Sequence, residues 1–269
     1  MTSAQRIIKY FALAIAAVII VSIISVSLTF LRGLSWLTNK KSVSTASMQT
    51  LNVKSTELTN LNIKVAFTNL IIKRGDHFKA ETNNDLLICK QDGNNLQITE
   101  KDEQFFSTNN EESLIIYLPE NLIFDKVNIN IGAGKTDIEV LDTKELFFEI
   151  GAGNAEIKNL NVLNTAEIEC GAGKLSIASG NIKDLKLEIG AGQSDVSSKI
   201  LGNSKIDVGV GNIKLHIPDN KDEYKLKINK GLGSIKIDNA EISDGEIKGN
   251  GENYIDIDGG IGNINIDFE

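Results

Sequence analysis

The stretch Ile131-Gly132-Ala133-Gly134-Lys135-Thr136-Asp137-Ile138-Glu139-Val140 decides the fold, because its pattern returns along the chain. The Gly-x-Gly core recurs at residues 151–153, 171–173, 190–192 and 209–211, a spacing of 19 or 20 residues. Looser copies stand at residues 231–233 and 260–262. A near-fixed short period of this kind is typical of solenoid proteins, in which each repeat stacks on its neighbours.

Each repeat predicts two short strands that meet at a corner. Before the glycines, apolar residues take every second place, as at Leu146, Phe148 and Ile150, which is the pattern of a strand with one buried face. After the glycines the alternation resumes out of step, at Ala155 and Ile157. A straight path would turn the second strand's apolar side outward, so the chain must bend at the glycines. The predicted corner glycines are Gly132, Gly134, Gly151, Gly153, Gly171, Gly173, Gly190, Gly192, Gly209 and Gly211.

Coiling is the arrangement that fits this period. A repeat of 19 residues leaves no room for a crossover helix, and the core repeats lack the Asn-Gly and Asp-Gly turns of hairpins. We therefore expect an all-β fold, a single-domain parallel β-solenoid (β-helix) over residues 126–269, with each coil paired to the next. The irregular β-rich region 51–125 is expected to cap its N-terminal edge, since an open edge invites aggregation.

The N-terminal part predicts an anchor. Residues 10–31 form an uncharged run of 22, enough for a transmembrane helix, which needs about 20 residues. Arg6 and Lys9 precede it, which favours residues 1–9 as a cytoplasmic N-terminus and the rest of the chain outside. A cleaved signal peptide is the alternative, but no A-x-A-like exit site follows. Residues 32–50, rich in Ser, Thr and Lys, are expected to be a linker.

Composition and motifs argue against several classes of function. A net charge of −8 disfavours nucleic-acid binding, which needs a basic face. Two cysteines, Cys89 and Cys170, are too few for a disulfide framework. No catalytic motif is present, so no catalytic residue and no cofactor is expected. No metal site is expected either, because the place of Asp137 in a calcium repeat becomes Lys214 and Lys236 in later repeats.

A ladder of acids is the candidate surface. Two residues before the first glycine, on the outward face, successive repeats carry Glu149, Glu169, Glu188 and Asp207. Stacked coils would place these carboxylates about 4.8 Å apart, where like charges repel. Lys186 and Lys205 share this face, so one interpretation is a solvated face neutralised by lysine. The other is a site for a cation, a cationic peptide or a lipid headgroup.

The repeat Ile-Gly-Ala-Gly-x-x-Asp/Glu-Ile resembles that of the bacterial "putative adhesin" family, extracytoplasmic β-strand-repeat proteins of unassigned activity. The lead-in at residues 70–78, 96–98 and 118–120 is similar to the family's entry pattern, so the resemblance covers roughly residues 51–269. It implies an N-terminal membrane anchor and, as for some members, a link to the cell-envelope stress response of Gram-positive bacteria. It transfers no catalytic residue.

These observations favour a single-pass protein of the cell membrane that displays an extracytoplasmic β-solenoid for binding, adhesion or envelope stress, without catalysis. Its expected partners are the membrane itself and an envelope polymer, a lipid or a cationic peptide, and the sequence does not specify an oligomeric state. The alternative is a bactofilin-like scaffold that polymerises inside the cell, which the long irregular region before the repeats disfavours. A third hypothesis is an enzyme acting on cell-wall glycans.

Overall fold

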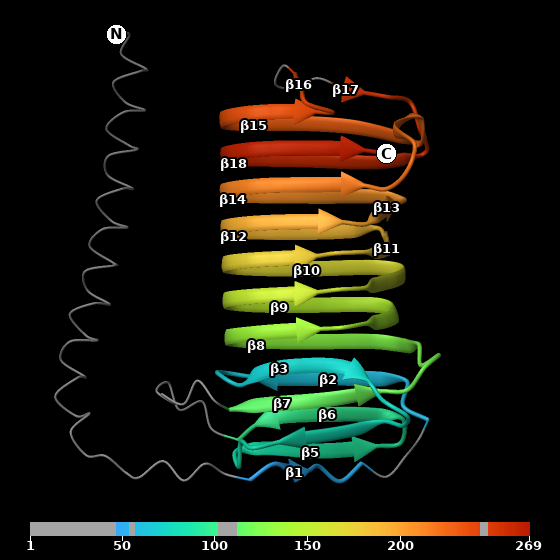
Figure 1. Ribbon diagram of the computed structural model, residues 1–269, viewed down its shortest axis with the longest axis vertical. Helices are drawn as coiled ribbons and strands as arrows, with labels where there is room; N and C mark the ends of the chain where they lie inside the picture. The colour runs from blue at the N-terminus through green and yellow to red at the C-terminus, as the bar shows by residue number, and fades with distance from the viewer. Residues whose placement is uncertain (1–46, 54–56, 102–111, 243–246) are drawn as a thin grey trace, which may run out of the picture. The chain divides into compact units, whose positions relative to one another are not determined.

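A computed structural model describes residues 47–53, 57–101, 112–242 and 247–269. The transmembrane helix predicted at residues 10–31 lies outside these ranges, as do the N-terminus and most of the linker. Within the described ranges, no helix is long and apolar enough to cross a membrane. The strands lie one above another in a single stack, and all 18 belong to one sheet (Figure 1).

Seven long strands form the regular coils, and each contains a corner together with the runs before and after it. These strands are β8 (Phe124–Ile138), β9 (Leu141–Ile157), β10 (Leu160–Ile177), β12 (Leu185–Ser197), β14 (Asn203–Ile217), β15 (Tyr224–Ile237) and β18 (Asn253–Phe268). They pair in parallel and in repeat register, so Gly153 lies between Gly134 and Gly173. The predicted all-β parallel solenoid is confirmed for this region.

The alternation of buried and exposed side chains shifts by one residue at each corner, as predicted. In β9 the side chains of Leu146, Phe148 and Ile150 are buried before the corner, and those of Ala155 and Ile157 are buried after it. Full burial of one large aliphatic or aromatic side chain contributes about 1.5–3 kcal/mol. Columns of such residues therefore hold the coils together. A short third side completes each coil, where the start of β10 pairs with β11 (Gly180–Lys183) and β11 with β13 (Lys199–Leu201).

The C-terminal coils do not follow the order of the sequence. The expectation that each repeat pairs with the next is wrong here, because β18 lies between β14 and β15 and pairs in parallel with both. Figure 1 shows β15 beyond β18 at the end of the stack. The connection includes η2 (Lys221–Glu223), a 3-10 helix between β14 and β15. The last strand of the chain is thus an interior coil.

The N-terminal end has the same interleaving. Strands β2 (Asn60–Val65) and β3 (Asn69–Arg74) form one coil, because they pair in parallel with the two halves of β8. Their other edges pair in parallel with β6 (Asn95–Glu100) and β7 (Ser113–Leu118), which come later in the chain. The coil formed by β6 and β7 therefore lies nearer the N-terminal end of the stack than the β2–β3 coil, although it comes later in the sequence.

Short antiparallel strands cover both ends of the stack. At the N-terminal end, β5 (Leu87–Asp92) pairs with β6, β4 (Lys79–Thr82) with β7, and β1 (Gln49–Thr50) with β4. At the C-terminal end, β16 (Ala240–Glu241) and β17 (Ile247–Lys248) pair with β15. Such strands occupy edge groups that would otherwise recruit another chain.

Candidate functional site: an acidic column beside an apolar corner

The Gly-x-Gly corners bring one side chain per coil to the surface between two glycines. The second glycine, as at Gly153, has φ +137, and a Cβ there would overlap the carbonyl oxygen of Gly134 in the coil below. The first glycine, as at Gly151, has no positive φ, but a Cβ would lie 2.5 Å from the carbonyl oxygen of Gly132. Both positions need glycine, so the residue between them is the only side chain at the corner.

The predicted acidic ladder forms a column in strict register. Glu169 lies between Glu149 and Glu188, and Glu188 lies beside Asp207. The structure adds Asp258 next to Asp207, because the inserted strand β18 continues the stack there. We call these five residues the acidic column. The sequence carries the signal for Asp258, two residues before Gly260, but the irregular spacing of the last repeats hid its place.

Four of the five acids in the column have hydrogen-bond partners, and two of the four pair with lysine. Lys186 Nζ lies 3.0 Å from Glu188 and 2.6 Å from Glu167, and hydrogen bonds to both acids raise the pKa of its ammonium group. Lys205 Nζ lies 2.7 Å from Asp207. Asparagine amides close the two ends, where Asn130 donates to Glu149 and Asn229 donates to Asp258 at 2.8 Å. These pairs agree with the interpretation of a lysine-neutralised face.

Glu169 differs from its neighbours. In the described part of the chain its carboxylate makes no hydrogen bond and no ion pair. Partial burial, followed by the charges of Glu188 and Glu167, raises its pKa above the ordinary value, and Lys186 acts in the opposite direction. The centre of the acidic column therefore carries the least compensated charge.

An apolar ridge runs along the corner, parallel to the acidic column. The residues between the glycines are Ala133, Ala152, Ala172, Ala191, Val210, Ile261 and Leu232, in the order of the stack. The last three are large and exposed, with exposed fractions of 52%, 53% and 69%. We call these seven residues the apolar ridge. The first glycines, exposed and without side chains, separate it from the acidic column.

The entry coil continues the same corner without glycine. The β2–β3 coil pairs with both halves of β8 at one offset, which places Ala66-Phe67-Thr68 beside the first Gly-Ala-Gly. Phe67 is half-buried in the position of the apolar ridge. A cavity of about 280 Å³ lies here, lined by Lys64, Val65, Ala66, Phe67, Glu100, Asn130 and Gly132. Sequence reasoning missed this coil because it lacks the Gly-x-Gly signal.

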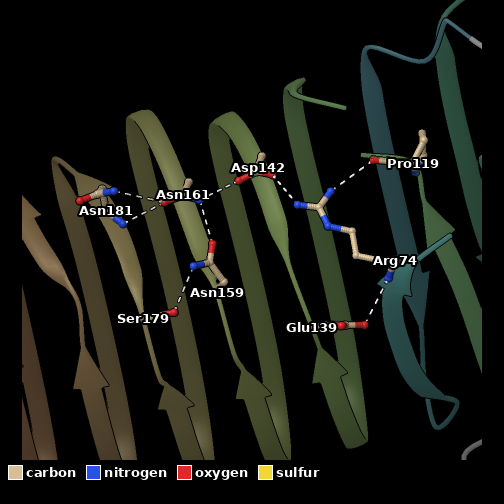
Figure 2. A network of polar contacts seen from close by, with 8 residues as sticks. All are labelled: Arg74, Pro119, Glu139, Asp142, Asn159, Asn161, Ser179 and Asn181. Carbon is tan, nitrogen blue, oxygen red and sulfur yellow. Dashed lines mark hydrogen bonds and ion pairs between the residues drawn. The ribbon is translucent and has the colours of Figure 1, made fainter. Parts of the chain in front are cut away.

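A polar network crosses the coils away from this corner (Figure 2). Asn161 donates to Asp142 at 2.7 Å and accepts from the backbone N–H of Asn181 at 3.1 Å. The Arg74 guanidinium reaches Asp142 at 3.4 Å and the carbonyl of Pro119 at 3.3 Å. These contacts join the N-terminal end of the stack to the regular coils. They help to fix the register of the coils.

Other candidates are weaker. The described residues contain no group of three or more His, Cys, Asp or Glu side chains able to hold a metal ion. Cys170 is buried and Cys89 half-buried, both are free thiols, and burial raises the pKa of each. A cavity of about 400 Å³ at the C-terminal end is lined by Tyr224, Leu226, Ile237 and Phe268 among others, and it lies where the capping strands meet the last coil.

One solved structure and one family model support the fold. No curated protein matches the chain. A solved structure described as "a putative adhesin" from Bacteroides fragilis has a TM-score of 0.55 at 12% identity, covering 82% of this chain and 97% of its own. A "putative cell adhesion protein" from Clostridium sporogenes is 18% identical over 83% of this chain and 99% of its own, with a TM-score of 0.37.

At these identities a structural likeness shows the fold alone, and the second score is too low to support any argument. The family comparison is stronger, because the family model covers most of the chain, including the entry strands and every regular coil except β18. It matches residues 49–247, and the chain therefore belongs to the Toastrack DUF4097 family.

Proposed function

We propose that this protein is anchored in the cell membrane by residues 10–31 and displays its solenoid outside the cell as a binding surface. The uncharged run of 22 residues supports the anchor, and Arg6 and Lys9 before it support the direction. The Bacteroides fragilis structure described as "a putative adhesin" supports a surface role through its similar fold alone. The protein acts by binding and carries out no reaction.

One observation carries this proposal: the corner with its apolar ridge and acidic column. The ridge runs through seven coils in register and the acidic column through the five inner ones, so the corner presents a long surface rather than a deep pocket. A repeating surface of this kind suits an extended partner, because successive coils offer the same contact again. The antiparallel strands at both ends argue against end-to-end polymerisation, the property of the bactofilin-like alternative.

Protease shaving of intact cells tests the display. A C-terminal epitope tag on the full chain is followed by immunoblot before and after protease treatment, with a cytoplasmic protein as the integrity control. We expect the tag to be lost from intact cells. Protection of the tag in wall-stripped cells, with loss only after lysis, would contradict extracytoplasmic display and revive the intracellular scaffold.

A further inference from the structure

We propose that the Gly-x-Gly corner is the docking surface for a cationic amphipathic helix that lies along the stack. The apolar ridge contacts the helix's apolar face, and the acidic column contacts its lysines or arginines. The inference rests on the proposed binding function and names the class of partner.

The apolar ridge exposes more hydrocarbon than a surface strand needs. Single exposed aliphatic residues are ordinary on protein surfaces. Here Val210, Ile261 and Leu232 are each more than half exposed and lie side by side in register on three adjacent coils. Glycines flank each of them, so the three side chains stand above the local surface. A contiguous apolar patch of this kind marks an interaction site.

The charge beside the ridge selects the partner. In the runs of β9, β10 and β12 that precede the glycines (residues 144–150, 165–170 and 185–189), five acids stand against two lysines. Glu169, at the centre, has no ionic partner among the described side chains and lies in register between the carboxylates of Glu149 and Glu188. Partial burial, and after it repulsion from neighbouring carboxylates, raises its pKa. A partner with positive side chains would relieve that repulsion. An anionic lipid surface would instead add to it, so a cationic peptide fits better.

The spacing of the coils favours a helix over an extended peptide. Coils repeat at about 4.8 Å, and an α-helix advances about 5.4 Å per turn, so the two stay within a few ångströms over several coils. In an extended chain, side chains on one face recur about every 6.6 Å, so they fall out of register with the coils sooner. Seven coils span about 29 Å, the length of a helix of roughly 19 residues.

The backbone of the corner also excludes strand addition over most of its length. The coils on either side already pair with each internal coil, as Gly153 lies between Gly134 and Gly173. A partner therefore contacts side chains rather than backbone edges, which is how amphipathic helices are recognised. Apolar contacts supply most of the affinity, and the column of acids sets orientation.

The test uses the full chain in nanodiscs of zwitterionic lipid and a fluorescent Leu/Lys peptide of about 19 residues with one apolar helical face. A scrambled peptide of the same composition and empty nanodiscs are the blanks. We expect the amphipathic peptide to bind. Ile261→Ser in the ridge should weaken binding about fivefold, and Glu169→Gln in the column about twofold.

Two matched variants control for general effects. Leu163→Ser removes an apolar side chain that is 52% exposed but lies away from the apolar ridge. Glu156→Gln removes an exposed acid of β9 that follows the corner and lies outside the acidic column. Both should bind like the wild type. Equal weakening by the controls, or equal binding of the scrambled peptide, would reduce the interaction to non-specific charge and overturn the proposal.

Absence of peptide binding, or binding of the chain to anionic vesicles that Ile261→Ser abolishes, would also overturn it. Neither result bears on the display proposal, because protease shaving uses no ligand. Failure of the docking proposal can therefore be told apart from failure of the display proposal.

Discussion

At the scale of the residue, the second glycine of each corner is the position least open to change. Gly153 combines φ +137 with a Cβ site that overlaps the carbonyl oxygen of Gly134. We expect Gly153→Ala to lower the free energy of unfolding by more than about 2 kcal/mol, because strain and a backbone clash add. Urea unfolding followed by circular dichroism measures this.

Gly93→Ala is the matched control for that prediction. Gly93 has φ +55 in the turn between β5 and β6, but its Cβ site is open. This variant should cost about 1 kcal/mol, from the left-handed conformation alone. Equal losses for the two variants would mean that contact between coils does not decide the corner residue.

Glu169→Gln tests the charge of the acidic column. The pKa of Glu169 is raised in the folded protein, so its ionised form destabilises the fold near pH 7, and protonation on acidification removes that penalty. The variant should therefore be more stable at pH 7 by about 0.2–0.5 kcal/mol, and the advantage should vanish below the ordinary carboxylate range. Thermal unfolding at pH 7 and pH 3.5 checks this. An advantage that persists at low pH would contradict a charge effect.

The sequence predicted four of the five members of the acidic column. Position two before the glycines predicted Glu149, Glu169, Glu188 and Asp207, because alternation in a strand fixes which side chains face outward. Asp258 satisfies the same rule. That Asp258 lies beside Asp207 could not be inferred from the sequence. The repeat spacing gives the position of a residue within its coil, but it does not give the order in which the coils stack.

At the scale of the element, the order of the last coils separates two lysines by an aspartate. Register places Asp256 of β18 between Lys205 of β14 and Lys227 of β15, and Lys227 Nζ lies 2.9 Å from Asp256. If β15 paired directly with β14 in the same register, the two lysines would face each other. Like charges directly opposite destabilise a sheet. Such cross-strand terms are small individually, and the sequence pattern alone does not reveal them.

This order predicts an unusual result for truncation before β18. If the coils followed the sequence, deleting residues 253–269 would leave β15 paired with β14. In the structure, β15 pairs among the described strands with β18 and the short strands β16 and β17. We therefore expect the truncated chain to lose two coils.

Trypsin should then cut at Lys225 and Lys227, and mass spectrometry would identify the fragments. The full chain, in which both lysines lie in a paired strand, is the control. Protection of β15 in the truncated chain would show that it can re-pair with β14.

At the scale of the whole molecule, the stack combines a repetitive middle with two interleaved ends. Sequence periodicity predicted the regular coils in the middle of the stack, because the residue pattern of each repeat indicates two strands and a corner. It could not predict the ends, because β2–β3 lacks the corner glycines and β18 enters the stack out of order. In the middle, each coil contacts only its neighbours, and stability should be close to a sum over coils.

Because each coil in the middle of the stack contacts only its two neighbours, one whole coil can be deleted without changing the pairing of the others. Ala172 and Ala191 are paired residues, so deleting residues 172–190 joins Gly171 to Ala191 with the corner intact. Glu167 would then lie beside Lys205 in place of Lys186, while Asp195 would meet Glu156 at a cost of a few tenths of a kcal/mol, about 0.3. We expect a folded β protein that is one coil shorter.

Its urea unfolding should keep a single transition, with a slope lower by roughly a tenth because less surface is exposed. Deleting residues 172–181 is the control, since it removes half a coil and places Ile182 where Ala172 should stand. That variant should lose the register of every coil beyond β10 and unfold. If both deletions folded equally well, the corners would not set the register, and the stack would be held by apolar content alone.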